Sequence, residues 1–208
     1  IVKNTQFAIQ TKPDYAIAIE RLPGQGNNVI VFGSTVCEIF TQVGGLENYR
    51  RNKSINLDYG CISVSTIASS DQFVAWLAVN ESNAPVIMIF SGQSAVPISS
   101  DGIDYLLGSI KHPEQSTAMF YRIDGHLFYH LTFYHEDDNL TLAYDFITKK
   151  FYNLTKENLD YHSAAEVIYF EKYLLFVSLR NGSVYKMSTD FTTYNDNIEG
   201  ENPALVDP

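Results

Sequence analysis

Short apolar runs with alternating polarity recur along the whole chain. Most are roughly five to nine residues long and combine Val, Ile, Thr and aromatic residues, a composition typical of β-strands. The strands that we expect comprise residues 15–21, 28–33, 35–43, 61–67, 73–79, 86–90, 96–98, 117–123, 126–133, 140–146, 151–154, 164–170, 173–179 and 184–187. This pattern predicts an all-β fold.

Polar turn signals separate these runs. Asp124 and Gly125 lie between two of the expected strands, and Asn181 and Gly182 lie between two others. Both dipeptides suit the positive φ angles of a type I′ hairpin turn. Longer polar hairpin tips are expected at residues 80–83 and 137–139. Because tight turns join antiparallel neighbours, the sheets are expected to be antiparallel.

One segment, residues 100–111, has the periodicity of a helix. Its apolar residues recur at intervals of three and four and form one stripe on a helix surface. They are Ile103, Leu106, Leu107 and Ile110. Ser100 or Asp101 can cap the start of this helix, and Pro113 follows its end. The segment is expected to be a short insertion in an otherwise β-structure.

A repeat appears when the strand groups are aligned. The runs at residues 73–77, 127–131 and 174–178 each form the second strand of a group, at a spacing of roughly 50 residues. Groups of four antiparallel strands at this spacing indicate β-propeller blades, and the strands before residue 44 indicate an incomplete earlier blade. We expect a propeller-like domain over residues 1–198 and a polar tail over 199–208. An irregular β-sandwich is the alternative.

Charge and composition narrow the classes of partner. The chain has 14 basic and 24 acidic residues and a net charge of −10, so it lacks the basic surface on which nucleic-acid affinity depends. It also lacks an apolar run of ~18 residues that could span a membrane. We therefore expect neither sequence-specific nucleic-acid binding nor membrane association. Cys37 and Cys61 are expected to be buried as small apolar residues. Because Ile1 stands where Met would begin a chain, we expect a piece of a longer protein.

Candidate metal ligands are few and poorly spaced. His126 and His130 share one face of an expected strand but lie ~13 Å apart at ~3.3 Å per residue, so this pair cannot hold one metal ion. His135 lies beside the acidic residues 136–138, and the segment 137–139 lacks the spaced oxygen ligands of a calcium loop. No metal-ligating residue is predicted.

Other candidate chemistry is equally sparse. The glycine-containing segment 23–28 has no following Lys and Ser/Thr and precedes a strand, so it is interpreted as a turn. Ser34 and Ser91 lie in no nucleophile elbow. The carboxylates considered for a glycosidase pair are Glu20, Glu38, Asp104 and Asp145. Triplets of the type Asn-x-Ser/Thr begin at Asn52, Asn80, Asn139, Asn153 and Asn181 and are interpreted as turn residues. No catalytic or cofactor-binding residue and no cofactor are predicted.

Several segments carry motifs of one known family. They are an aromatic-Gly-Ser and Glu-bearing hairpin at 31–45, a strand end at 59–68, an Ile-Ser-Ser helix start at 98–107, Phe-Tyr-Arg-Ile-Asp-Gly-His-Leu-Phe-Tyr at 120–129, Leu-Ala-Tyr-Asp at 142–145 and Phe-Tyr-Asn at 151–153. Over about residues 28–190 the chain resembles the packaged-DNA stabilisation proteins, or tail accessory factors, of short-tailed bacteriophages.

The resemblance implies a non-enzymatic virion protein made in the bacterial host cytoplasm. It implies a tail-hub component that helps to close the DNA channel, retains the packaged genome and connects neighbouring tail components. The implied partners are other tail and portal-adaptor proteins, in a homo-oligomeric ring. Two alternatives remain: a carbohydrate- or protein-binding propeller of a cell surface, and a hydrolase whose site the sequence does not reveal.

Overall fold

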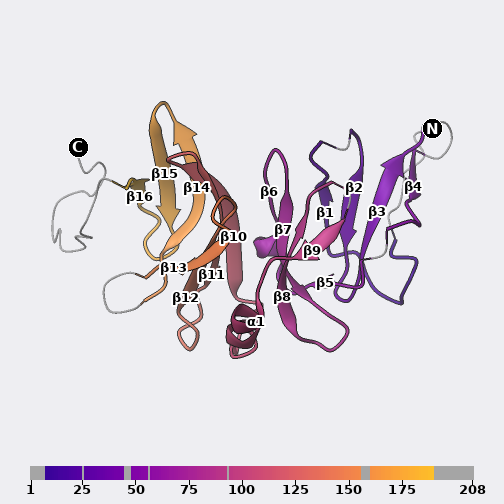
Figure 1. The fold of residues 1–208 in the computed structure, drawn as a ribbon, viewed down its shortest axis with the longest axis horizontal. Helices are drawn as coiled ribbons and strands as arrows, with labels where there is room; N and C mark the ends of the chain where they lie inside the picture. Colours follow the sequence, from indigo (N-terminus) through magenta and orange to yellow (C-terminus); the bar gives the residue numbers. More distant parts are fainter. Residues whose placement is uncertain are drawn as a thin grey trace. The chain divides into compact units, whose positions relative to one another are not determined.

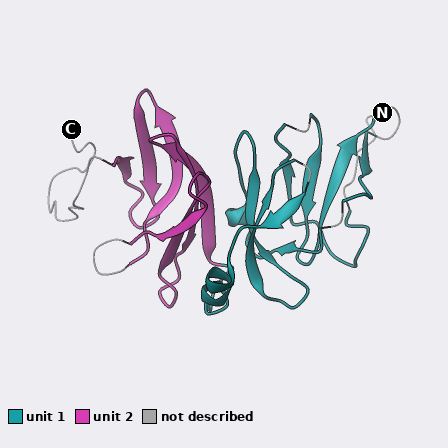
Figure 2. Ribbon diagram, viewed as in Figure 1, with its two compact units in different colours: residues 1–114 teal, residues 115–208 magenta. Residues whose placement is uncertain are grey.

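The fold is mainly antiparallel β-structure. The computed structural model describes residues 8–24, 26–44, 48–55, 57–92, 94–155 and 160–189. Within these ranges the chain forms four sheets, one α-helix and one short 3-10 helix (Figure 1). It divides into two compact units, residues 1–114 and 115–208, and each unit contains two of the sheets (Figure 2).

The first sheet of unit 1 has four strands rather than the expected incomplete set. The strands are β1 (Ala18–Arg21), β2 (Val29–Phe32), β3 (Cys37–Gln42) and β4 (Tyr49–Arg51), hydrogen-bonded in this order. The sequence pattern missed β4, which reads Tyr-Arg-Arg and therefore shows no apolar alternation. Its pairing with β3 completes the sheet and corrects the expectation.

The second sheet of unit 1 surrounds two long central strands. Its strands are β5 (Gly60–Cys61), β6 (Ala68–Ser69), β7 (Val74–Val79), β8 (Pro85–Phe90) and β9 (Ala95–Pro97). The single strand expected over 61–67 is wrong, because the 3-10 helix η1 (Val64–Thr66) interrupts it. The amide and Oγ1 of Thr66 both donate to the Ser63 carbonyl, at 3.0 and 2.6 Å. The same hydroxyl accepts from the Leu77 amide at 3.1 Å, so a side chain replaces a strand contact to β7.

The core of unit 1 lies between these two sheets. Trp76 and Phe32 meet edge to face at 5.3 Å, and the Trp76 indole donates to the Gly60 carbonyl at 3.2 Å. Cys37 and Cys61 are buried free thiols in this core, as expected, and burial raises the pKa of Cys61 to about 12. The buried residues of the cluster also include Leu22, Ile30, Ile39, Leu57, Val74, Ala78, Val86, Met88 and Phe90.

The inserted helix is confirmed, but it is shorter than expected. Helix α1 (Asp101–Leu107) follows β9 and packs against β8. The Ser100 side chain makes no capping hydrogen bond. The amide and hydroxyl of Ser109 both bond to the Leu106 carbonyl, at 3.0 and 2.6 Å, and this tighter turn ends the helix before residue 111. Of the expected apolar stripe, only Leu107 is fully buried.

Unit 2 repeats the antiparallel arrangement. Its first sheet comprises β10 (Ser116–Ile123), β11 (His126–Phe133), β12 (Leu140–Asp145) and β13 (Lys150–Asn153). Its second sheet has three described strands, β14 (Ala164–Phe170), β15 (Tyr173–Ser178) and β16 (Val184–Met187). The strands β7, β11 and β15, which the repeat aligned, are all central in their sheets. The aligned runs therefore form inner strands in three of the four sheets, although β7 follows two short strands of its sheet and β15 follows a single strand.

The hairpin turns of unit 2 differ from one another. Asp124 and Gly125 have φ angles of 49° and 83°, which confirms the expected type I′ geometry. At the second site only Gly182 has a positive φ, 69°, so the type I′ expectation is wrong there. The Asn181 side chain instead accepts a hydrogen bond from the Ser183 amide at 3.0 Å and shapes a longer loop.

Aromatic contacts join the two sheets of unit 2. Met119 and Tyr121 of β10 pack in one cluster with Leu174 and Phe176 of β15, and the Tyr121 ring stacks on Phe128 at 5.3 Å. The fold class, antiparallel all-β with one inserted helix, is confirmed. A single propeller-like domain over residues 1–198 remains a prediction, and the expected tail over 199–208 lies outside the described residues.

Gly60 allows the closest backbone approach in unit 1. Gly60→Ala is expected to lower the free energy of unfolding by about 2–3 kcal/mol, because the new methyl group would collide with the main chain of Ser34 and Thr35. Gly102→Ala is the control, since a Cβ there meets no atom within 4 Å, and it is expected to stabilise the exposed helical position by about 0.5 kcal/mol. Urea denaturation measures both, and equal stabilities would contradict the close approach.

Candidate functional site

The histidines of β11 have separate partners. His126 Nδ1 lies 2.8 Å from Asp145 Oδ2 on the neighbouring strand β12. His130 is buried, and its ring lies 5.2 Å from that of His162. His135 lies beyond the end of β11, in the hairpin that leads to β12. Each of the three imidazoles therefore has its own structural setting.

Asp145 is a buried turn-forming carboxylate. Its Oδ1 accepts from the Ile147 amide at 2.9 Å, and its Oδ2 accepts from the Thr148 hydroxyl at 2.8 Å. Burial opposes ionisation, but these hydrogen bonds and the one from His126 outweigh it and lower the pKa of Asp145. The carboxylate thus holds the β12–β13 turn, in which Lys149 has a φ of 56°. This arrangement gives Asp145 a structural role in the turn.

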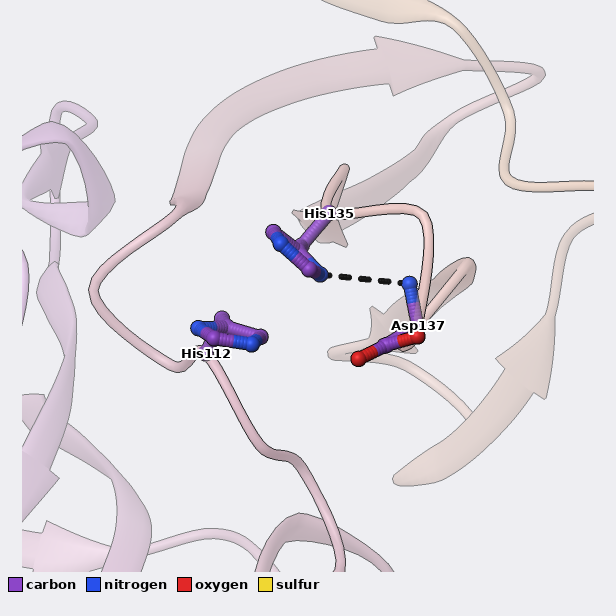
Figure 3. Close-up of side chains that lie close together, drawn as sticks. All are labelled: His112, His135 and Asp137. Atoms are coloured by element: carbon purple, nitrogen blue, oxygen red, sulfur yellow. Dashed lines mark hydrogen bonds between the residues drawn. The ribbon is translucent and has the colours of Figure 1, made fainter.

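The acidic hairpin tip is organised by local hydrogen bonds. His135 Nδ1 accepts from the Asp137 amide at 3.2 Å (Figure 3). The Asn139 side chain donates to the Glu136 carbonyl at 2.9 Å, and this residue has the positive φ expected of a hairpin tip. Figure 3 also labels His112, which belongs to unit 1. That the tip holds no Ca²⁺ remains a prediction.

Glu38 of β3 is an anchor that the sequence pattern did not reveal. Although it is only 2% exposed, its Oε1 accepts from the Thr11 hydroxyl at 2.6 Å, the Thr11 amide at 2.8 Å and the Gln10 amide at 3.0 Å. Arg51 Nε lies 3.2 Å from the same oxygen and balances its charge. The available signal was one carboxylate between the apolar residues Cys37 and Ile39.

Residues 10–14, which we call the N-terminal strap, fasten the two sheets of unit 1. Asp14 accepts from the Ser34 hydroxyl and the Thr35 amide, both at 2.7 Å, at the β2–β3 turn. Lys12 Nζ lies 3.1 Å from Asp58 and 2.7 Å from Glu81, in the segment before β5 and in the β7–β8 hairpin respectively. With Glu38, these contacts tie the strap to both sheets.

The remaining candidates occupy turns and sheet contacts. Glu20 of β1 accepts from the Ser69 hydroxyl of β6 at 3.2 Å, and Asp104 lies in α1. Gly24 and Gly26, with φ angles of 67° and 64°, confirm the strand-connecting turn. The amide side chains of the Asn-x-Ser/Thr triplets serve turns at three sites: Asn52 accepts from Ser54, Asn80 from Ser82 and Asn181 from Ser183.

The second sheet of unit 2, β14–β16, packs against β10 with one face. Its opposite face is largely apolar. We call it the open face. By register it carries Glu166, Ile168 and Phe170 of β14, Tyr173, Leu175 and Val177 of β15, and Val184 and Lys186 of β16. Ile168 and Phe170 are 62% and 59% exposed. A cluster of exposed apolar side chains is typical of surfaces that bind other proteins. No helix of the described residues is long and apolar enough to cross a membrane.

Antiparallel sheets with a recurring central strand are the units from which β-propeller proteins are built. A family model described as "Bacteriophage P22 Gp10, beta-propeller" matches residues 5–192, and the chain belongs to this phage stabilisation family. The chain is therefore a phage structural protein with a role in packaged-DNA stabilisation, and it acts in the virion with other virion proteins. The family resemblance inferred from the sequence is confirmed. No curated protein matches the chain.

The histidines generate a test of metal binding. We expect no stoichiometric Zn²⁺ or Ni²⁺ at His126, His130 or His135, since His126 is engaged with Asp145 and His130 is enclosed in the core. Metal analysis of the protein after incubation with each ion and desalting measures this. A bound ion that is lost in His126→Ala, His130→Ala or His135→Ala would contradict the expectation.

Proposed function

We propose that this protein is part of a phage tail hub that helps to close the DNA channel after packaging. In this role it retains the genome and connects neighbouring tail components. The observation that carries the proposal is the family match over residues 5–192. The proposed function is mechanical, and we propose that the chain catalyses no reaction and holds no metal or cofactor.

The net charge supports a channel that does not bind DNA tightly. With 24 acidic and 14 basic residues, the chain repels a polyanion at a distance. A basic channel would neutralise several phosphates and hold the genome, most strongly at low salt. An acidic protein can block DNA sterically and later let it slide past. Retention and release are then governed by the position of the protein rather than by its affinity for DNA.

Contacts between proteins supply the cohesion in this proposal. The open face of β14–β16 offers Ile168, Phe170 and Val177 to a partner, and the cores of protein interfaces are enriched in such apolar and aromatic residues. We propose that the partners are tail and portal-adaptor proteins and further copies of this chain in a ring. Synthesis in the host cytoplasm would precede their assembly into the virion.

DNA binding distinguishes this function from a DNA-gripping one. We expect no measurable affinity for labelled duplex DNA at about 50 or about 150 mM salt, because the protein has too few basic side chains to displace counterions from the DNA. Fluorescence anisotropy measures the titration. The exposed pair Glu136 and Asp137, changed to Lys in a control variant, should bind more strongly than the unchanged protein. Micromolar binding by the unchanged protein that weakens steeply with salt would contradict the proposal.

Self-association tests the open face. Ile168→Asp should weaken association of the protein at high concentration, because a carboxylate would be buried against an apolar partner surface. Ile147→Asp is the matched control, since Ile147 is 61% exposed and lies in the β12–β13 turn. Sedimentation velocity over a concentration series measures both variants. Association that survives Ile168→Asp would exclude the open face as the contact.

A further inference from the structure

Two imidazoles meet between the sheets of unit 2. His130 comes from β11 and is 1% exposed, and His162 lies just before β14 and is partly buried. Their rings are T-shaped, 5.2 Å apart at an interplanar angle of 68°. The His162 ring also lies 5.3 Å from Phe176 of β15. The imidazole pair, His130 and His162, thus links one sheet of the unit to the other.

The hydrogen bonding of the imidazole pair fits neutral rings. Neither ring nitrogen of His130 has a hydrogen-bond partner among the described residues. His162 Nδ1 faces the Ala164 amide at 3.4 Å and accepts its hydrogen, so this nitrogen carries no proton. Protonation would remove that acceptor at His162, and at His130 it would create a buried cation without an acceptor.

The surroundings offer little compensation for a charge. Besides His162, the Tyr121 ring lies 5.8 Å from the His130 ring, and by register the paired hydroxyls of Thr132 and Thr141 lie on the same face of the sheet. Strand register and side-chain contacts show which ionisable groups surround the imidazole pair. They are Tyr121 of β10, His126 of β11, Asp145 of β12, Lys150 and Tyr152 of β13, Tyr169 of β14, Tyr185 of β16, and Asp160, Tyr161 and Arg180 beside His162. Strand β15 presents no ionisable group on this face.

Both carboxylates in this set are already engaged. Asp145 accepts from His126, Ile147 and Thr148. Asp160 lies 2.6 Å from Arg180, whose guanidinium also stacks over the Tyr161 ring. Neither carboxylate is left to stabilise an imidazolium at His130 or His162.

The pKa values of the imidazole pair follow from this setting. Burial lowers the pKa of His130 to about 3, with a smaller contribution from His162, and burial lowers the pKa of His162 to about 4. In an unfolded chain an imidazole has a pKa of about 6.5. At pH values between about 4 and about 6.5, the imidazole pair is neutral in the closed unit and takes up protons when the unit opens.

We propose that the imidazole pair makes the contact between the two sheets of unit 2 acid-labile. Proton uptake by His130 and His162 separates β14–β16 from β10–β13 and exposes the apolar cluster of Met119, Tyr121 and Phe176. The unit is thereby a sheet pair that opens in acid, and the separated sheet β14–β16 loses the packing that protects its amides from exchange. A pair of aliphatic residues at these positions would pack without this sensitivity.

The direction of the effect follows from proton linkage. Because the closed unit binds protons more weakly than the open one, its stability is fully present above about pH 6.5. It falls as the pH drops from there towards the pKa values of the closed state. Each histidine adds about tenfold to the opening equilibrium constant per pH unit in this window. Removing one imidazole should therefore make the rise of the opening equilibrium constant about tenfold smaller for each pH unit; we call this rise the slope.

Amide hydrogen exchange of the whole chain tests the proposal. In the unchanged protein, opening measured at β15 amides and corrected for intrinsic exchange should rise steeply between about pH 6 and pH 4. In His130→Leu the opening equilibrium constant should rise by a factor about ten times smaller for each pH unit. The stability of this variant at pH 7.5 should be retained or increased, because no buried nitrogen is left unpaired. An unchanged slope in His130→Leu would overturn the proposal.

Two controls separate this opening from general acid unfolding. His135→Gln removes an imidazole from the β11–β12 hairpin instead, and it should leave the slope unchanged. The amide of Trp76, in the core of unit 1, should stay protected from exchange while β15 opens. A slope lowered equally by His135→Gln, or a simultaneous change at Trp76, would count against the imidazole pair.

NMR titration of the imidazoles covers the case in which His130→Leu fails to fold. The Cε1–H signals of His130 and His162 in the unchanged protein should show neutral rings down to about pH 5. His162→Phe provides a second variant with the same expected loss of slope. A His130 signal that titrates near pH 6.5 in the closed protein would overturn the proposal.

Discussion

Both faces of β7, the central strand of its sheet, must be covered, and the packing of unit 1 depends on this constraint. All six residues of β7 are buried, and since successive side chains point to opposite faces, such a strand needs a packing layer on each side. In unit 1 one face of β7 places Trp76 against Phe32 of the neighbouring sheet. Tight antiparallel hairpins supply the hydrogen-bonded neighbours of β7 within its sheet, and the first sheet of unit 1 supplies the packing layer on one face.

Buried polar groups show how strictly this packing is satisfied. Glu38 and Asp145 are nearly inaccessible. Glu38 Oε1 and both oxygens of Asp145 accept hydrogen bonds that offset the cost of burying the charge, whereas Glu38 Oε2 has no partner among the described residues. His130 is as deeply buried, but its ring nitrogens lack partners among the described residues. Only a neutral group can occupy such a position at low cost. The difference makes the two carboxylates fixed structural anchors and leaves the imidazole sensitive to protons.

The sequence predicts those parts of the fold whose signal is local. The strands β11, β14 and β16 have the expected bounds, because each alternates or concentrates apolar residues between clear turns. Strand β4 was missed since pairing with β3, rather than its own composition, makes it a strand. The polar sites were less predictable. Thr11 lies 27 residues from Glu38 in the sequence. His130 lies in β11 and His162 lies in the segment before β14. No rule of sequence spacing could therefore have predicted either contact.

The two units use different chemistry to fasten similar sheet pairs. Unit 1 adds the N-terminal strap, whose Lys12 contacts with Asp58 and Glu81 are partly exposed and therefore weakened by salt. Unit 2 uses the apolar cluster between β10 and β15 and neutral imidazoles, which salt barely affects and acid disrupts. Since all four sheets share one antiparallel plan, the response of each unit to its surroundings is set by the few polar residues between its sheets.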